Sequence, residues 1–203
     1  TAPNGQAQQG LLAAALGDAG TVADALALSE AHGTGTALGD PIEAGPLAGV
    51  TLSQRGGDAA LALGSSKANI GHGEPAAGAS GLLSLALALC RAEAPPNAQL
   101  RAMNALVEAA LKGHACGAAV GVGALGGAED GGVGGVSSFG YSGTIAHAVV
   151  QASSGSARVR GIGAAAAIPY KRRRYAWREK PHPFAQQLLD RSSPPTFTSP
   201  SQG

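Results

Sequence analysis

Residues 30–43 read EAHGTGTALGDPIE, and they join the end of a strand to a glycine-rich turn and the start of a helix. The apolar residues 25–31 that run into this turn predict a short buried strand. Asp40, Pro41 and Glu43 are typical of the N-cap, first and third positions of a helix, with Asp40 and Glu43 forming a capping box. We expect this helix to run to about residue 54. A strand followed at once by a helix is the repeating unit of an α/β fold.

A second stretch, residues 67–78, reads KANIGHGEPAAG and has the same arrangement. It follows another apolar run, residues 60–65, and leads into an apolar helix expected over residues 76–92. Each turn carries one histidine, His32 in the first and His72 in the second. Because ligands bind at the carboxyl ends of parallel strands, we expect the two imidazoles to face one pocket.

The rest of the body adds two helices and three strands. Residues 6–15 and 99–112 predict helices, whereas residues 115–125, 133–138 and 144–151 predict strands, the last two as a hairpin. The predicted fold class is therefore layered α/β, with a largely parallel, buried sheet that is closed by antiparallel strands.

Composition and charge exclude several classes of protein. Hydrophobic residues make up 44% of the 203 residues and charged residues 13%, which suits a packed core. No apolar run is long enough to span a bilayer, so we expect no membrane association, and two cysteines fit a reducing compartment better than a disulfide scaffold. Residues 1–150 carry 5 Lys and Arg against 11 Asp and Glu, whereas residues 151–203 carry 9 against 2, so an acidic body precedes a basic tail.

From the residues alone, the two histidines are as readily structural as catalytic. A metal site of His32, His72 and His147 lacks ligand spacings such as HxxxH or CxxC, so we expect none. The glycine clusters match neither a Walker A loop nor GxGxxG, which disfavours nucleotide binding. Cys90 is interpreted as a buried thiol in the apolar helix, and Cys116 has no base or tight turn beside it, so neither is expected to be a nucleophile.

Three motifs in this order resemble the β-ketoacyl synthases, in particular the ketosynthase domains of polyketide synthases. Two are the stretches quoted above, and the third is residues 136–147, VSSFGYSGTIAH. The resemblance covers about residues 1–151 and implies the C-terminal half of a thiolase-like, layered α/β/α fold, in which two similar halves stack as five layers. We therefore expect residues 1–151 to be this half-domain and residues 152–203 to be a post-ketosynthase linker, partly disordered.

The resemblance also implies roles for individual residues. His32 and His72 match two active-site histidines that donate hydrogen bonds to the thioester carbonyl of a malonyl-type extender as it loses CO₂. Lys67 matches a catalytic-motif lysine, and Glu43 matches the acidic residue that pairs with it.

Other matches concern the substrate. Thr34 and Thr36 match hydroxyls that hold the phosphopantetheine arm, and Phe139 and Tyr141 match an aromatic pair beside the acyl pocket. The backbone N–H of Tyr141 would contribute to an oxyanion hole. Ile145 departs from the family, which usually has asparagine in this GTNAH stretch.

The reaction that the resemblance implies is a decarboxylative Claisen condensation of a cysteine-bound acyl group with a malonyl unit on an acyl carrier protein. We expect no metal and no bound cofactor, because the carrier protein delivers the phosphopantetheine. The nucleophilic cysteine of a DTACSS-like turn is absent, so we expect this fragment alone to be inactive. In the family that cysteine belongs to the N-terminal half, which is also expected to supply a homodimer contact. The expected location is cytoplasmic, with a plastid as an alternative.

Two alternative functions remain open: a fatty-acid-type β-ketoacyl synthase, and a non-catalytic half-domain that serves as a chain-length partner or scaffold. The long tail favours a multidomain parent. Within it, residues 169–184, PYKRRRYAWREKPHPF, resemble the linker that leaves a ketosynthase. We therefore expect no nucleic-acid binding by its basic residues.

Overall fold

The computed structural model describes residues 2–57, 59–126 and 132–152, all within the first of the two units of the chain, Thr1–Ala165. Its centre is a five-stranded sheet of order β4-β2-β1-β6-β7. The strands are β1 (Leu26–Glu30), β2 (Leu61–Gly64), β4 (Cys116–Gly117), β6 (Val133–Phe139) and β7 (Ile145–Gln151). All neighbours are parallel except β6 and β7, which form an antiparallel hairpin. The predicted layered α/β sheet with its antiparallel end is confirmed.

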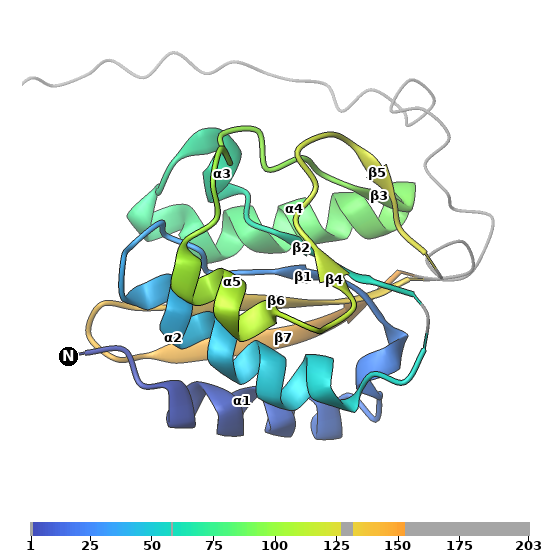
Figure 1. Ribbon diagram of the computed structural model, residues 1–203, viewed down its shortest axis with the longest axis horizontal. Helices are drawn as coiled ribbons and strands as arrows, with labels where there is room; N and C mark the ends of the chain where they lie inside the picture. The colour runs from blue at the N-terminus through green and yellow to red at the C-terminus, as the bar shows by residue number, and fades with distance from the viewer. Residues whose placement is uncertain (1, 58, 127–131, 153–203) are drawn as a thin grey trace, which may run out of the picture. The chain divides into compact units, whose positions relative to one another are not determined.

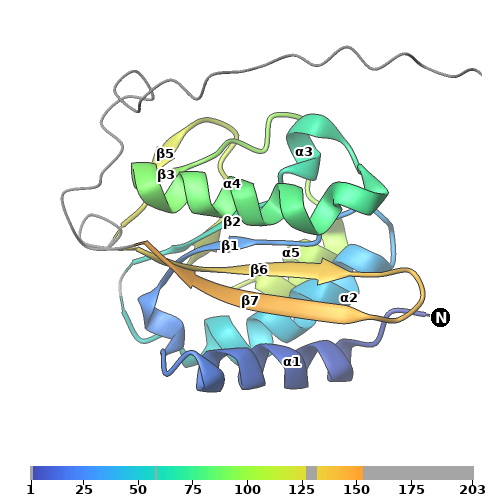
Figure 2. The same ribbon diagram turned by 180° about the vertical axis from the view of Figure 1, so that it is seen from behind.

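Helices cover both faces of this sheet (Figures 1 and 2). One face carries α1 (Gly5–Asp18) and α2 (Gly39–Pro46), with α5 (Ala105–Leu111) packed against α2. The other face carries α4 (Ala77–Arg91), with the short helix α3 (Lys67–Ile70) before it.

The central strand β1 is buried along its whole length, as its apolar sequence predicts. Two clusters of apolar side chains lie on either side of it. Leu28, Leu85 and Leu89 belong to the cluster under α4, and Leu12 and Leu61 belong to the cluster under α1. The sheet is thus the middle layer of the described fold.

Glycines let α4 and the sheet approach closely. A Cβ added at Gly134 of β6 would lie 2.5 Å from Leu85 Cδ1, and one added at Gly78 of α4 would lie 3.0 Å from Ser138 Oγ. The small residues at the start of α4 therefore allow the helix to pack closely against the sheet.

The capping box predicted for α2 is wrong. The helix begins at Gly39, its N-cap residue is Leu38, and no side chain caps it. The carboxylates of Asp40 and Glu43 bind the preceding loop instead. Beyond Pro46, which has no N–H to donate, the chain stays helical as a π-helix, η2 (Leu47–Thr51), and a 3₁₀ turn, η3 (Leu52–Gln54). The predicted end near residue 54 is therefore confirmed.

Four further predictions need correction. The strand expected over residues 115–125 consists of two short pieces, β4 and β5 (Gly123–Ala124), and β5 pairs with β3 (Glu93–Ala94) in a separate sheet. The helix expected over residues 99–112 contains only α5, and the expected polar turn before His72 contains α3. Cys90 is exposed on α4, because it lies on a face of the helix that no described residue covers.

The expected linker, residues 152–203, with its 169–184 motif, lies outside the described residues apart from residue 152. Among the helices that the structure describes, none is both long enough and apolar enough to cross a membrane. Among all the residues that the structure describes, no three or more His, Cys, Asp and Glu side chains lie together in a group that could bind a metal ion.

Candidate active site

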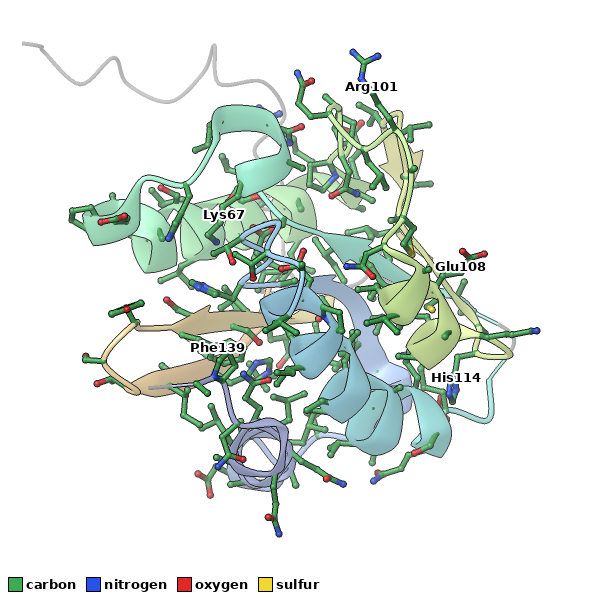
Figure 3. The ribbon with its side chains drawn as sticks, turned by 60° about the vertical axis from the view of Figure 1, so that its left-hand side comes forward. Lys67, Arg101, Glu108, His114 and Phe139 are labelled. Carbon is green, nitrogen blue, oxygen red and sulfur yellow. The ribbon has the colours of Figure 1, made fainter. Side chains whose placement is uncertain are left out.

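Three neighbouring parallel strands end at one edge of the sheet, and the predicted site residues follow them. His32 comes two residues after β1, Lys67 and His72 follow β2, and Phe139 is the last residue of β6. Parallel pairing of β1 with β2 and with β6 brings these strand ends together. In Figure 3, Lys67 and Phe139 lie on one side of the molecule, whereas Arg101, Glu108 and His114 lie on the other.

The two histidines and Phe139 form one ring cluster. The ring centroids of His32 and His72 are 5.7 Å apart with the rings nearly perpendicular, and those of His32 and Phe139 are 5.4 Å apart. Nδ1 of His32 is buried and has no hydrogen-bond partner among the described residues. This imidazole atom therefore lacks the hydrogen bond that a buried polar atom normally makes.

His32 is held as a neutral imidazole. Burial lowers its pKa to about 4, and electrostatic interactions with Lys67 and His72 act in the same direction. A neutral imidazole keeps one N–H donor and one acceptor nitrogen. His32 is therefore suited to donate a hydrogen bond at neutral pH without carrying a charge.

Glu43 holds the loop that carries His32. Its two carboxylate oxygens accept hydrogen bonds from the backbone N–H groups of His32, at 2.7 Å, and Gly33, at 2.9 Å. Burial raises the pKa of Glu43 to about 7, although these two N–H donors and the charge of Lys67 oppose the rise. Lys67 thus acts on Glu43 through its charge, while backbone groups make the direct hydrogen bonds. Gly33 has φ +45°, which glycine adopts without strain.

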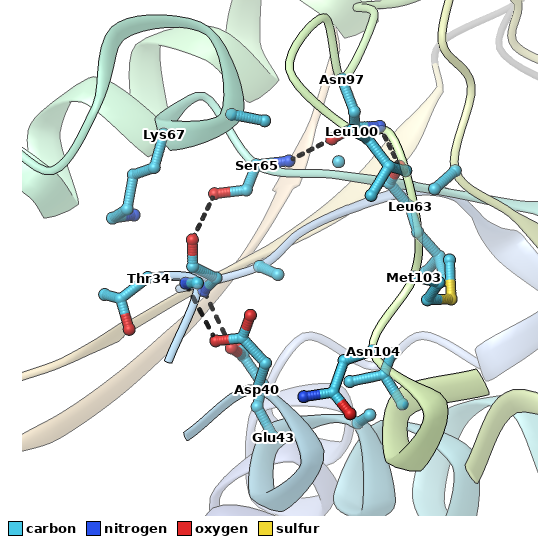
Figure 4. A pocket seen from close by; sticks show the side chains of 18 of the residues that line it. Thr34, Asp40, Glu43, Leu63, Ser65, Lys67, Asn97, Leu100, Met103 and Asn104 are labelled. Atoms are coloured by element: carbon cyan, nitrogen blue, oxygen red, sulfur yellow. Dashed lines mark hydrogen bonds between the residues drawn. The ribbon is translucent and has the colours of Figure 1, made fainter. Parts of the chain in front are cut away.

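A cavity of about 660 Å³ lies beside this cluster. Its lining includes Thr34, Thr36, Lys67 and His72, together with apolar side chains. The apolar part comprises Leu47, Leu63, Leu100, Met103, Val107 and Leu111. Figure 4 shows the polar residues Thr34, Ser65 and Lys67 on one side, and Leu63 and Met103 on the other.

The structure does not bring every predicted residue into this cavity. Phe139 contacts the ring of His32, but neither of these two residues lines the cavity, and Tyr141 is 95% exposed in the turn between β6 and β7. Ile145 begins β7 directly opposite Phe139. Neither cysteine lines the cavity: Cys90 lies in the last turn of α4, and burial raises the pKa of the Cys116 thiol, which disfavours its thiolate.

Sequence reasoning missed two buried polar residues. Asn97 accepts a hydrogen bond from the Ser65 N–H and donates to the carbonyls of Leu63 and Ala119, so it holds one wall of the cavity. Its sequence signal is its position directly after two consecutive prolines, Pro95 and Pro96. Glu30 is fully buried at the end of β1. Its sequence signal is the position of a carboxylate at the end of an otherwise apolar strand.

Comparisons with known proteins agree with this geometry. Residues 1–101 match the family described as "Beta-ketoacyl synthase, C-terminal domain". Erythronolide synthase EryA3 of Saccharopolyspora erythraea is 41% identical over 150 residues, which are 73% of this chain and 5% of that protein. A component of the phenolphthiocerol/phthiocerol polyketide synthase of Mycobacterium tuberculosis is 39% identical over 178 residues, 84% of this chain and 9% of that protein.

A solved structure gives the same result for the fold. Ketosynthase twelve of the bacillaene polyketide synthase of Bacillus amyloliquefaciens matches with a TM-score of 0.69 and 32% identity, over 76% of this chain and 27% of that chain. The chain thus spans less than a tenth of these two curated relatives and about a quarter of a solved ketosynthase.

Proposed function

Because the chain belongs to the β-ketoacyl synthases as a C-terminal ketosynthase half-domain, we propose that it supplies the decarboxylation half of a polyketide synthase condensing site. The fatty-acid alternative is not favoured, since the curated relatives reported above are polyketide synthases. The substrate class is a malonyl-type thioester on the phosphopantetheine arm of an acyl carrier protein.

The proposed step removes CO₂ from the extender unit. The bond between its α-carbon and its carboxylate breaks, CO₂ leaves, and the electron pair passes to the thioester carbonyl oxygen as an enolate. The N–H groups of His32 and His72 donate to that oxygen. The enolate carbon then attacks the acyl carbon of a thioester on a cysteine outside this chain, and the cysteine thiolate leaves.

The single observation that carries this proposal is the pairing of His32 and His72. Their rings are 5.7 Å apart, and His32 has a buried Nδ1 without a partner among the described residues. Donors fixed in advance around a developing negative charge are worth about 3 kcal/mol each. The lowered pKa of His32 also fits this role, because a neutral imidazole stabilises the enolate without being acidic enough to protonate its carbon.

The surrounding residues fit a substrate arm. Thr34 and Thr36 line the cavity and are proposed to bind the amides of the phosphopantetheine. Glu43 is proposed to hold the loop that carries His32, and Lys67 is proposed to keep the imidazole of His32 uncharged. Dimerisation through the other half of the fold, and docking of a carrier protein, are further parts of the proposal.

The test is a decarboxylation assay on the longer synthase that contains this chain, with its nucleophilic cysteine blocked by alkylation. We expect His32→Ala and His72→Ala each to slow CO₂ release from a malonyl carrier protein by on the order of 100-fold. His114→Ala is the control, because His114 lies on the other side of the molecule (Figure 3). Release at the wild-type rate in either site variant would overturn the proposal and favour the scaffold alternative.

A further inference from the structure

Glu30 is an ionisable side chain to which the mechanism above assigns no role. It ends β1 and has no exposed surface. One carboxylate oxygen accepts a hydrogen bond from the Ser66 backbone N–H at 2.6 Å, and the Ser84 hydroxyl on α4 donates to the other at 3.5 Å. Burying a carboxylate is costly unless a charge or donors compensate it, so its presence here requires a partner.

Two glycines leave the space that the Glu30 carboxylate fills. A Cβ on Gly81 of α4 would lie 3.4 Å from Glu30 Cγ, and a Cβ on Gly64 of β2 would lie 3.7 Å from Glu30 Oε2. The side chain is therefore enclosed between β2 and α4, and its carboxylate is held beneath the turn that begins α3.

This turn carries Lys67. Ser66, whose N–H binds Glu30, is the residue directly before Lys67. Burial lowers the pKa of the Lys67 ammonium, and two carboxylates oppose this, Glu30 from β1 and Glu43 from α2. Burial raises the pKa of Glu30, and the Ser66 N–H and the charge of Lys67 oppose this rise. The charge of Lys67 likewise opposes the rise at Glu43, and it adds to the lowering of the His32 pKa that burial causes.

We propose that Glu30 is a positioning residue for Lys67: its buried carboxylate fixes the turn on which Lys67 stands and is the counter-charge that keeps the ammonium beside the two histidines. This assignment rests on the proposed function, because Lys67 bears on catalysis only if those histidines do. Of the two carboxylates near Lys67, Glu43 makes its direct hydrogen bonds to the His32 loop, so Glu30 is the one bound to the turn of Lys67 itself.

The competing explanation is that Glu30 only ties α3 to β1 through its hydrogen bond with Ser66. Glutamine separates the two explanations, since it keeps an oxygen that can accept this bond and removes the charge. Aspartate does the reverse, because it keeps the charge on a side chain that is shorter by one methylene.

The quantity to measure is the pKa of Lys67, which an NMR titration of the whole chain labelled with ¹³C-lysine gives directly. Glu30→Gln should lower it by about 1 pH unit, the effect expected for removing a nearby opposite charge, and Glu30→Asp should restore most of it. Lys112 is the internal reference, and Glu108→Gln is the matched control, since both residues are exposed and Glu108 lies on the other side of the molecule. An unchanged Lys67 pKa in a folded Glu30→Gln chain, or an equal fall in both Glu30 variants, would overturn the proposal.

A reciprocal experiment covers the case in which Glu30→Gln does not fold. Lys67→Met changes a residue at the cavity edge, and it should raise the pKa of the Glu30 carboxyl, measured with ¹³C-glutamate, because the Lys67 charge lowers it. No change in that value would also reject the assignment. Neither experiment measures decarboxylation, so a failure here is distinguishable from a failure of the proposed function.

Discussion

Replacing Glu43 by glutamine should remove a pH dependence from the stability of the chain. Burial raises the pKa of this carboxyl from 4.5 to about 7 while its oxygens bind the His32 and Gly33 N–H groups. Between these two pH values the folded chain holds a proton that the unfolded chain has already released. Stability must therefore fall as pH rises from about 4.5 to about 7, and stay level above that.

The size of the effect follows from the shift. Each pKa unit corresponds to 1.36 kcal/mol, so ionising Glu43 in the folded state costs on the order of 3 kcal/mol. Glutamine has no charge to bury, but it replaces one acceptor oxygen by an amide that cannot accept a backbone N–H, a loss of about 1 kcal/mol at every pH. Glu43→Gln should thus lie within about 1 kcal/mol of wild type below pH 4.5 and be about 2 kcal/mol more stable above pH 7.

Urea unfolding followed by circular dichroism, at about pH 4.5, 6 and 8, measures this difference directly. Glu108→Gln removes the same charge from an exposed position on α5 and serves as the control. If the stabilities of wild type and Glu43→Gln run parallel across this pH range, the carboxylate is not buried at a cost and the reasoning is refuted.

Two further predictions concern the charge around His32 and the packing of α4. The imidazole NMR signal of His32 should titrate near pH 4, and Lys67→Met should move its midpoint upward, because the ammonium disfavours a second positive charge; an unmoved midpoint would contradict this coupling. Gly134→Ala should destabilise the chain by about 2 kcal/mol, because the new Cβ would lie 2.5 Å from Leu85 Cδ1. Gly117→Ala, where no atom lies within 4 Å, should be tolerated, and equal urea midpoints for the two variants would show that α4 can move away from the sheet.

The strands at the site could be predicted from the sequence because each strand is a short apolar run that ends in a polar, glycine-rich turn. Parallel pairing then brings His32 and His72 to one edge without any knowledge of side-chain contacts. The use of Asp40 and Glu43 could not be predicted in the same way. Their spacing fits a capping box, and only the path of the loop over α2 shows that Glu43 binds the N–H groups of His32 and Gly33 instead.

Burial of Glu30 and Asn97 escaped prediction for a related reason. Both are polar, and hydrophobic periodicity assigns polar residues to the surface or to a turn. Each is buried because backbone N–H or carbonyl groups at the end of β2 require a partner there, as the bonds of Asn97 to Ser65 and Leu63 show. Such a requirement appears only once the strand ends have been placed in space.

The exposed outer face of helix α4 could not be predicted from the sequence alone. Its inner face is fully buried at Leu85, while Leu83 and Leu87 on the outer face are 64% and 52% exposed, beside Cys90. A helix that is apolar all round is normally covered on both sides, so sequence alone predicted a buried Cys90. Under the proposed function, we expect the five-layer stacking implied by the resemblance to cover that outer face with the other half of the fold, which is also expected to carry the nucleophilic cysteine. This proposal would give one common explanation for the exposed leucines of α4 and for the absence, among the described residues, of a cysteine beside His32 and His72.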